Sequence, residues 1–410
     1  MKPLFSLLLF ILLVASSSAQ TASTTWNKFL SDFKKLEQEY KIYYPAKDYQ
    51  KAAATLTAIA TKMDSLQLTE KERQEFQSTI HEINANVYYY LACLQSMLHQ
   101  KKDAIASFDK AILWGYTDYR TALNNTELDH IRKDNEFMKA LAQLKQYDKL
   151  TLLQQSGGYM SENSASLPIF DYQAASNRNL VAVKDFFNLD SIAGHGDEIS
   201  KLCNIMLFVA NTIKYDGSNW ALCEFDAIDF YNYHKASGKG INCRHKAMTL
   251  NEMYLAMGFK SRYVTCMPKD DKDTDCHVIN SVYSETLKKW LWMDPSHGTF
   301  VMDDKNNLLS IEEVREHLRN NQPLKLNSAS KVSKIWYLDS YMAKNLYWIQ
   351  CTNRSQFNTE SRYRPADPAL QYISLIPSGW DTSNNKYLKN NVVTHDPAYF
   401  WRSPERNATP

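Results

Sequence analysis

The spacing of hydrophobic residues along this chain changes from a helical period to a strand period. From residue 24 to about 148, apolar side chains recur at steps of three and four residues, as in Trp26, Phe29 and Phe33, which predicts helices alone. After Gly258 the period becomes two, which predicts strands. The strands are expected at residues 259–267, 276–283 and 288–293. Helices followed by neighbouring strands predict an α+β fold with an antiparallel sheet.

The N-terminal helices form an expected domain of residues 20–150, and one helix pair in it is informative. Between Val87 and Ile112, small and aromatic residues stand where two antiparallel helices pack closely and a ring fills the gap. The pattern resembles a tetratricopeptide repeat, on the residues Tyr88, Leu91, Ala92, Ala104, Phe108 and Ala111. A plain bundle of helical hairpins is the alternative. In either case this domain offers a surface for a protein partner and carries no catalytic group.

The start of the chain has the pattern of a secretory signal. Lys2 precedes an apolar core from Leu7 to Ala15, and small residues follow. This core is far shorter than the roughly 20 residues that a membrane span needs, which predicts a signal peptide of residues 1–19 and a mature chain from Gln20. No cysteine lies near the cleavage point, and no later stretch approaches a span. The sequence therefore predicts a secreted or periplasmic protein with no membrane span after signal removal.

Charge and cysteine content narrow the classes of partner. The 47 Lys and Arg residues nearly balance the 45 Asp and Glu residues, so the net charge of +2 gives no electrostatic basis for binding nucleic acid or an anionic membrane. The seven cysteines are odd in number, so at least one thiol stays free or pairs with another molecule. Export permits disulfides without requiring them. A peptide or protein is the expected substrate.

Composition divides the second half of the chain. Residues 151–180 are rich in Ser, Gly, Asn and Ala, which predicts a linker. A catalytic domain is expected at residues 181–330, with residues 331–410 as an extension packed on it. Between residues 332 and 351, aromatic side chains stand at helical spacing. This spacing predicts mainly core positions, and the alternative is that some of these rings line a groove for a peptide or a sugar.

The residues that carry chemistry begin with Cys243, in the first turn of a predicted helix that Gly258 ends as a left-handed cap. A helix N-terminus offers free backbone N–H groups and partial positive charge, which favour a thiolate over a thiol. His277 lies on the second predicted strand and Asp294 follows the third. We predict Cys243 as nucleophile, His277 as general base and then acid, and Asp294 as the carboxylate that orients the imidazole. Each residue alone suits a structural role, and only the ordered set indicates catalysis.

The segment from about Asp197 to Pro295 resembles the transglutaminase-like domain of the papain-type cysteine enzymes. The resemblance rests on Gly240-x-x-Cys243 opening a helix, Gly258-Phe259-Lys260-Ser261-Arg262-Tyr263-Val264 as its exit into a strand, His277, and Trp292-Met293-Asp294-Pro295. It implies a papain-like α+β domain and the same three roles for Cys243, His277 and Asp294.

Two positions depart from the family pattern. Arg244 stands where animal cross-linking members usually have Trp, and Val278 follows His277 where many members have a small residue. The donors of the oxyanion hole are unassigned. The backbone N–H of Cys243 and a side chain from residues 218–224 are the candidates.

Zinc is the competing chemistry, because cysteines and histidines gather between residues 243 and 277. Their spacing does not suit zinc, since no Cys-x-x-Cys pair occurs and Cys276 and His277 point to opposite faces of a strand. The acidic loop at residues 270–275 lacks the Gly and distal Glu of a calcium loop, which favours a solvated hairpin tip. We therefore predict no metal and no cofactor.

The sequence favours a cysteine-dependent acyl-transfer enzyme that hydrolyses amide bonds of peptides or of peptidoglycan peptides, with water as the acyl acceptor. One alternative is a protein cross-linking acyltransferase, which requires a site that excludes water and admits an amine. The other alternative is a catalytically inactive scaffold that recruits a partner through its helical domain.

Overall fold

The computed structural model describes residues 24–162, 166–365 and 367–404. The chain folds as two units, Met1–Asp148 and Lys149–Pro410. The predicted signal peptide, residues 1–19, lies outside the described residues. In the part of the chain that is described, no helix has both the length and the apolar character needed to cross a membrane.

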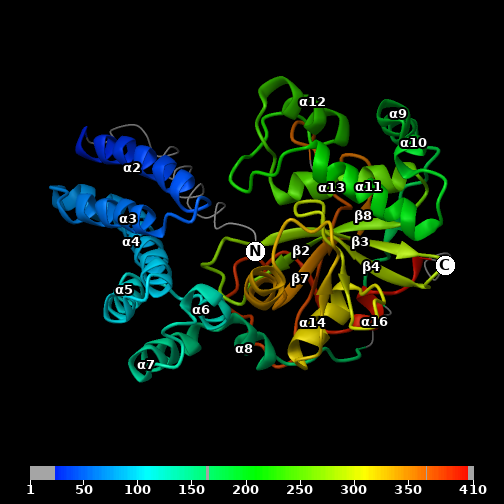
Figure 1. The fold of residues 1–410 in the computed structure, drawn as a ribbon. Helices are drawn as coiled ribbons and strands as arrows, with labels where there is room; N and C mark the ends of the chain where they lie inside the picture. Colours follow the sequence, from blue (N-terminus) through cyan, green and yellow to red (C-terminus); the bar gives the residue numbers. More distant parts are fainter. Residues whose placement is uncertain (1–23, 163–165, 366, 405–410) are drawn as a thin grey trace. The chain divides into compact units, whose positions relative to one another are not determined.

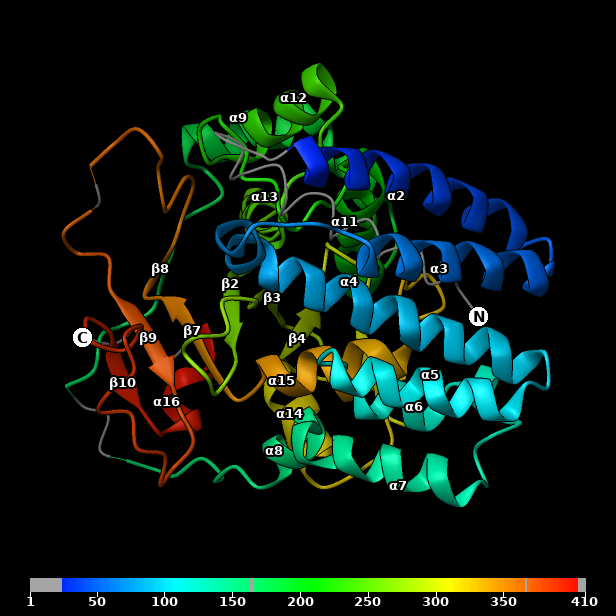
Figure 2. The ribbon, with the colours of Figure 1, turned by 90° about the vertical axis from the view of Figure 1, so that its left-hand side faces the viewer.

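The described part of the first unit is built from helices (Figure 2). They are α2 (Thr24–Tyr43), α3 (Tyr49–Asp64), α4 (Glu70–Met97), α5 (Lys101–Leu113), α6 (Tyr119–Asn124) and α7 (Asn135–Leu144), with short 3-10 turns η1 (Thr126–Leu128) and η2 (Lys145–Tyr147). Helices α2 to α5 pack in succession, each against the next. Ala92 and Ala104 lie buried where α4 meets α5, beside the buried ring of Phe108. The helical prediction is confirmed, and the likeness to a tetratricopeptide repeat stays a prediction.

The second unit is organised around a six-stranded sheet in the order β10-β9-β7-β2-β3-β4 (Figure 1). The strands are β2 (Ser261–Met267), β3 (His277–Ser284), β4 (Lys289–Met293), β7 (Trp348–Thr352), β9 (Tyr372–Leu375) and β10 (Val392–Thr394). The three strands predicted from the sequence pair antiparallel as expected, β2 with β3 and β3 with β4. The sheet is mixed, however, because β10 runs parallel to β9 at one edge. The α+β class is confirmed.

Helices cover both faces of this sheet (Figure 1). One face carries α9 (Arg178–Phe187), α10 (Leu189–Ala193), α11 (Glu198–Thr212), α12 (Ala227–Ser237) and α13 (Cys243–Ala256). The other carries α8 (Lys149–Gln154), α14 (Ile311–Arg319), the π-helix η3 (Ile335–Met342), α15 (Ala343–Asn345) and α16 (Pro397–Phe400). Short strands pair outside the main sheet, namely β1 (Asp171–Tyr172) with β8 (Arg354–Ser355) and β5 (Val301–Met302) with β6 (Lys325–Leu326).

Helix α13 lies at the centre of the second unit. The sequence predicts one buried face, but every residue from His245 to Ala256 is buried, because α13 packs against α9, α11, α12 and the strands β2 and β3. Gly258 ends the helix with φ +84°, and the Phe259 N–H donates to the Tyr254 carbonyl at 2.9 Å. These are the features of a Schellman cap, so the predicted C-terminal signal is confirmed.

Two segments outside the expected catalytic domain are integral to the second unit. Residues 151–180, predicted as a linker, contain β1, which pairs with β8, and the buried Phe170. Residues 331–410, predicted as an extension packed on the domain, supply β7, β9 and β10 of the central sheet. Strand β7 pairs directly with β2, so residues 331–410 form interior strands of the sheet as well as its β10 edge.

The buried Arg262 on β2 joins these segments to the core. Its guanidinium lies 4.4 to 5.1 Å from the ring centroids of Phe170, Trp290, Phe400 and Trp401, and it donates to the Phe400 carbonyl at 2.6 Å. A buried guanidinium is stable only where such partners replace water. Through Arg262, strand β2 therefore contacts residues that precede the expected catalytic domain in the sequence and residues that follow it.

All seven cysteines are free thiols in the structure. Cys93, Cys266 and Cys351 are buried. The remaining four are partly exposed, namely Cys203, Cys223, Cys243 and Cys276.

Candidate active site

Cys243 is the first residue of α13, and two local features fix its position. Asn242 caps the helix, because its Oδ1 accepts the backbone N–H of His245 at 3.0 Å. Gly240 passes so close to the neighbouring chain that an added Cβ would lie 2.6 Å from the Cβ of Asp216. The turn that leads into Cys243 therefore requires a glycine, and Cys243 is presented partly exposed at a helix N-terminus.

His277 and Asp294 meet from adjacent antiparallel strands. His277 begins β3, Asp294 follows β4, and His277 Nε2 donates to Asp294 Oδ2 at 2.8 Å, with both side chains wholly buried. Cys243 is near enough to the imidazole to help raise the pKa of His277. Asn280 on β3 also donates to the Ala247 carbonyl of α13 at 2.9 Å. The structure thus brings together the three residues singled out in the sequence.

Burial and charge act on this pair in opposite directions. Burial alone favours a neutral imidazole and a neutral carboxyl. The charge and hydrogen bond of Asp294 outweigh burial and hold the pKa of His277 above its ordinary range. The charge and hydrogen bond of His277 outweigh burial in the same way and hold the pKa of Asp294 well below its ordinary range. Both pKa shifts favour the charged forms, an imidazolium beside a carboxylate, and an imidazolium carries a proton that a leaving group can take.

Asp294 is held by two further donors. Tyr337, on the π-helix η3, is wholly buried and donates through its OH to Asp294 Oδ2 at 2.5 Å. The backbone N–H of Ser296 donates to Asp294 Oδ1 at 2.7 Å. Both carboxylate oxygens therefore accept hydrogen bonds, which fixes the plane of the carboxylate that faces His277.

Tyr341, one turn further along η3, lies on the other side of the imidazole. Its OH is 3.5 Å from His277 Nδ1 and 3.3 Å from the Cys276 carbonyl, and its ring stacks on Trp336 with centroids 5.1 Å apart. π-helical turns are rare and recur at functional sites. The π-helix here presents two tyrosines to one histidine–carboxylate pair.

The sequence did not reveal these two tyrosines as part of the site. The only signal was their place in the aromatic run at residues 332–351, where most rings are expected in the core. Tyr337 satisfies that expectation by its burial. It serves the site through its hydroxyl group, and its ring packs edge to face against His277 and His297.

His297 is a third titratable side chain at the pair. Its ring stacks on His277 with centroids 5.6 Å apart, and burial lowers the pKa of His297 to about 4. His277, Asp294 and His297 place possible ligand atoms within 4.8 Å of one another, so among the described residues they form a group that could hold a metal ion. A metal there would have to replace the hydrogen bond between His277 and Asp294. This group differs from the set of residues weighed for zinc in the sequence.

The stretch expected to supply a second oxyanion donor has other contacts. Asn219 donates to the Gly240 carbonyl at 2.5 Å and to Tyr233 OH at 3.1 Å, so its amide supports the turn before Cys243. Trp220 packs its ring edge against His245, with centroids 4.8 Å apart. The second donor stays a prediction. The backbone N–H of Cys243, in the first turn of α13, suits the first donor.

Arg244, one of the two departures from the family pattern, anchors the start of α13. Its guanidinium forms a bidentate ion pair with Glu360, at 2.9 and 3.1 Å, and donates to Thr265 Oγ1 at 3.0 Å. Tyr263 and Tyr372 also donate to Glu360 Oε1, at 3.0 and 2.9 Å. The residue after the nucleophile is therefore tied to the last third of the chain.

Comparison with known proteins identifies part of this unit. No curated protein and no solved structure matches the chain. One family model matches residues 187–295, a segment that contains Cys243, His277 and Asp294 and ends before Tyr337. That family is the Transglutaminase-like superfamily, so the second unit contains a transglutaminase-like domain.

Proposed function

We propose that the second unit is a cysteine-dependent enzyme that hydrolyses amide bonds of peptides, through Cys243, His277 and Asp294. One observation carries this proposal: the buried contact of 2.8 Å between His277 and Asp294, beside a cysteine at a helix N-terminus. The match of residues 187–295 to a superfamily of mainly cysteine-dependent enzymes supports it. Within that class, peptides derived from peptidoglycan are the narrower substrate that the predicted export favours.

The proposed reaction has two stages. Cys243 Sγ attacks the amide carbonyl carbon, the carbonyl oxygen takes the negative charge, and the Cys243 backbone N–H stabilises it. The carbon–nitrogen bond then breaks while His277 gives its proton to the leaving amine, which leaves a thioester. In the second stage the neutral His277 accepts a proton from water and the resulting hydroxide attacks the thioester carbonyl carbon. The carbon–sulfur bond then breaks, which releases the carboxylic acid and leaves the Cys243 thiolate beside the His277 imidazolium.

Asp294 and Tyr337 act through His277 in this scheme. Asp294 keeps the imidazole in the orientation that places the Nδ1 proton towards Cys243, and Tyr337 holds Asp294. A water acceptor makes the enzyme a hydrolase, whereas an amine acceptor would make it a cross-linking enzyme. Water is the acceptor we propose, because an amine acceptor requires a site that excludes water.

Selective alkylation tests the proposed nucleophile. The protein is treated with iodoacetamide between pH 4 and 10, and the modified cysteine is located by mass spectrometry. We expect Cys243 to react first and His277→Ala to slow its reaction. The other thiols are internal controls, because burial raises the pKa of Cys203 and Cys276 to about 11 and of Cys223 to about 12, and Cys93, Cys266 and Cys351 are buried.

Turnover is tested separately on a set of synthetic peptides. The expected result is cleavage by the unmodified protein and none by the Cys243→Ser variant, with transient mass addition on Cys243 from the thioester. Cysteine reactivity without cleavage of any peptide would favour the scaffold alternative, and transfer of the acyl group to an added amine in preference to water would favour the cross-linking alternative.

We also propose that the protein is secreted or periplasmic, on the basis of residues 1–19. N-terminal sequencing of the protein from its native cells tests this proposal. A mature chain that begins at Gln20 supports it, and a retained Met1 contradicts it. The helical first unit is the proposed surface for a protein partner.

A further inference from the structure

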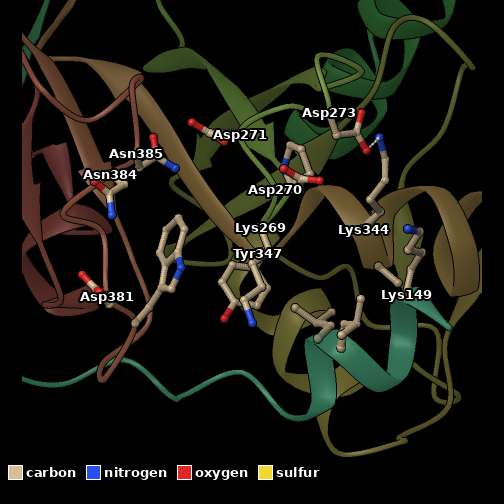
Figure 3. Close-up of a pocket in the computed structure, with 15 residues that line it drawn as sticks. Lys149, Lys269, Asp270, Asp271, Asp273, Lys344, Tyr347, Asp381, Asn384 and Asn385 are labelled. Atoms are coloured by element: carbon tan, nitrogen blue, oxygen red, sulfur yellow. Dashed lines mark hydrogen bonds and ion pairs between the residues drawn. The ribbon is translucent and has the colours of Figure 1, made fainter. Parts of the chain in front are cut away.

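A cavity of about 450 Å³ lies in the second unit, and the proposed reaction does not use it (Figure 3). Its walls come from α8, the loop between β2 and β3, α15 and the segment at residues 380–385. This volume suits a small ligand rather than a water cluster.

The floor of the cavity is apolar and aromatic. Trp380 and Tyr347 meet edge to face with ring centroids 5.2 Å apart, beside Leu152, Leu153 and Pro268. Trp380 is partly exposed, whereas Tyr347 is buried and has the Lys269 ammonium group 5.6 Å from its ring centroid. The indole of Trp380 is therefore the aromatic surface that a ligand can cover.

The rim of the cavity is polar and of mixed charge. Lys344 pairs with Asp273 at 2.9 Å, so this pair neutralises itself (Figure 3). The other charged groups are three carboxylates and two ammonium groups, from Asp270, Asp271, Asp381, Lys149 and Lys269. The carboxylates disfavour an anionic ligand and the ammonium groups disfavour a cationic one, so the rim suits a neutral ligand that both donates and accepts hydrogen bonds.

Asn385 contributes a free hydrogen-bond donor to the cavity. The residue lines the cavity, is only 7% exposed and accepts the Tyr387 N–H through Oδ1 at 3.0 Å. Within the described residues its amide Nδ2 has no hydrogen-bond partner. This nitrogen is not among the buried unpartnered polar atoms, so it is open to the cavity, where an acceptor on a ligand can bond to it.

We propose that this cavity binds a neutral saccharide. The carbon–hydrogen face of a sugar ring covers the Trp380 indole, its hydroxyl groups donate to the aspartates and accept from the lysines, and a sugar oxygen accepts from Asn385 Nδ2. The site is distinct from the catalytic triad, so it stands whether or not Cys243 is catalytic. The loop that forms one wall of the cavity leads directly to Cys276 and to His277, the first residue of β3. A bound saccharide would therefore contact the loop that precedes the proposed general base.

Calorimetric titration of the full mature chain tests this site. The probes are chitotetraose, cellotetraose and maltotetraose, with the zwitterionic dipeptide Ala-Ala for comparison. At least one oligosaccharide is expected to bind, and Trp380→Ala and Asn385→Asp are each expected to weaken that binding by about tenfold or more. Trp220→Ala is the matched control, because Trp220 is 50% exposed and lies outside the cavity.

Asn385→Asp keeps the acceptor for the Tyr387 N–H and replaces the free donor by a charged acceptor, so it tests the site even if Trp380→Ala fails to fold. Thermal unfolding of each variant verifies its fold. The proposal is overturned if no oligosaccharide binds at about 10 mM, if both variants bind as the unmodified protein does, or if Ala-Ala alone binds at this cavity.

Discussion

At the scale of single residues, Tyr337 adds a third hydrogen-bonded side chain to the pair formed by His277 and Asp294. A hydrogen bond to a charged group contributes about 1.5–3 kcal/mol, and this one also helps to keep the pKa of Asp294 low. Tyr337→Phe is therefore expected to slow alkylation of Cys243 by about tenfold or more and to move the pH dependence of that rate.

Tyr341→Phe is the matched control for that change. The Tyr341 hydroxyl lies 3.5 Å from His277 Nδ1, which is at the limit of a hydrogen bond, so its loss should have a small effect. Alkylation rates measured across pH for both variants compare the two. Equal effects of the two substitutions would mean that Tyr337 has no special role in holding Asp294.

His245 gives a prediction about pH and stability. It lies wholly buried against Phe230 with neither ring nitrogen hydrogen-bonded within the described residues, and burial lowers its pKa to about 3. In the unfolded chain His245 binds a proton once the pH falls below its ordinary pKa of about 6.5, whereas in the folded protein it stays neutral until about pH 3. The free energy of unfolding therefore decreases as the pH falls through this range. At pH 5 this loss amounts to about 2 kcal/mol.

His245→Phe removes that proton uptake and should stabilise the protein more at pH 5 than at pH 8. Urea unfolding of the variant and the parent at both pH values, followed by tryptophan fluorescence, measures the difference. A gain that is the same at both pH values would show that His245 is not the group responsible.

The three proposed catalytic residues could be recognised from the sequence because each stands next to a local signal. Cys243 begins a helix, His277 begins a strand and Asp294 directly follows one, and local periodicity predicts all three elements. Tyr337 is 43 residues beyond Asp294 and has no such signal, because its role depends on tertiary packing of the π-helix.

At the scale of elements, the turn that leads into α13 is built for close contact. A Cβ at Gly240 would lie 2.6 Å from the Cβ of Asp216 and 2.9 Å from the Lys214 carbonyl, so one of these segments would have to move. Gly240→Ala should destabilise the second unit by about 1–3 kcal/mol and displace Cys243. Chemical unfolding and the rate of Cys243 alkylation measure the two effects.

Gly238→Ala provides a control two residues away. Gly238 has φ +67° but open space around it, so alanine there costs only about 1–2 kcal/mol of backbone strain and leaves Cys243 in place. If Gly238→Ala slowed alkylation as much as Gly240→Ala, the close contact at Gly240 would not be what positions the nucleophile.

The boundaries of the helices and strands were predicted better than their burial and their tertiary pairing. Periodicity located β2, β3 and β4 within about two residues and indicated both ends of α13, because these signals are local. It gave α13 one buried face, whereas the helix is buried all round, since burial depends on how many other elements pack against it. The parallel edge pair of β9 and β10 is likewise a property of tertiary pairing.

At the scale of the whole molecule, the catalytic segment depends on chain far outside it. Residues 181–330 lack β7, β9 and β10, and they leave Arg262 without Phe170, Phe400 and Trp401. A fragment of residues 149–410 is expected to unfold cooperatively, and a fragment of residues 181–330 is expected to stay unfolded. Circular dichroism during thermal unfolding measures both, and cooperative unfolding of the shorter fragment would contradict this dependence.

The direct pairing of β7 with β2 has a consequence for biosynthesis. A ribosome makes Cys243, His277 and Asp294 well before it makes Tyr337 and the strand that completes the centre of the sheet. While the chain is still being translated, the nucleophile therefore lacks the support that its general base has in the finished protein. A chain that terminates between Asp294 and Tyr337 would carry all three residues but neither Tyr337 nor β7, so the order of synthesis delays any activity of the triad until these later residues are made.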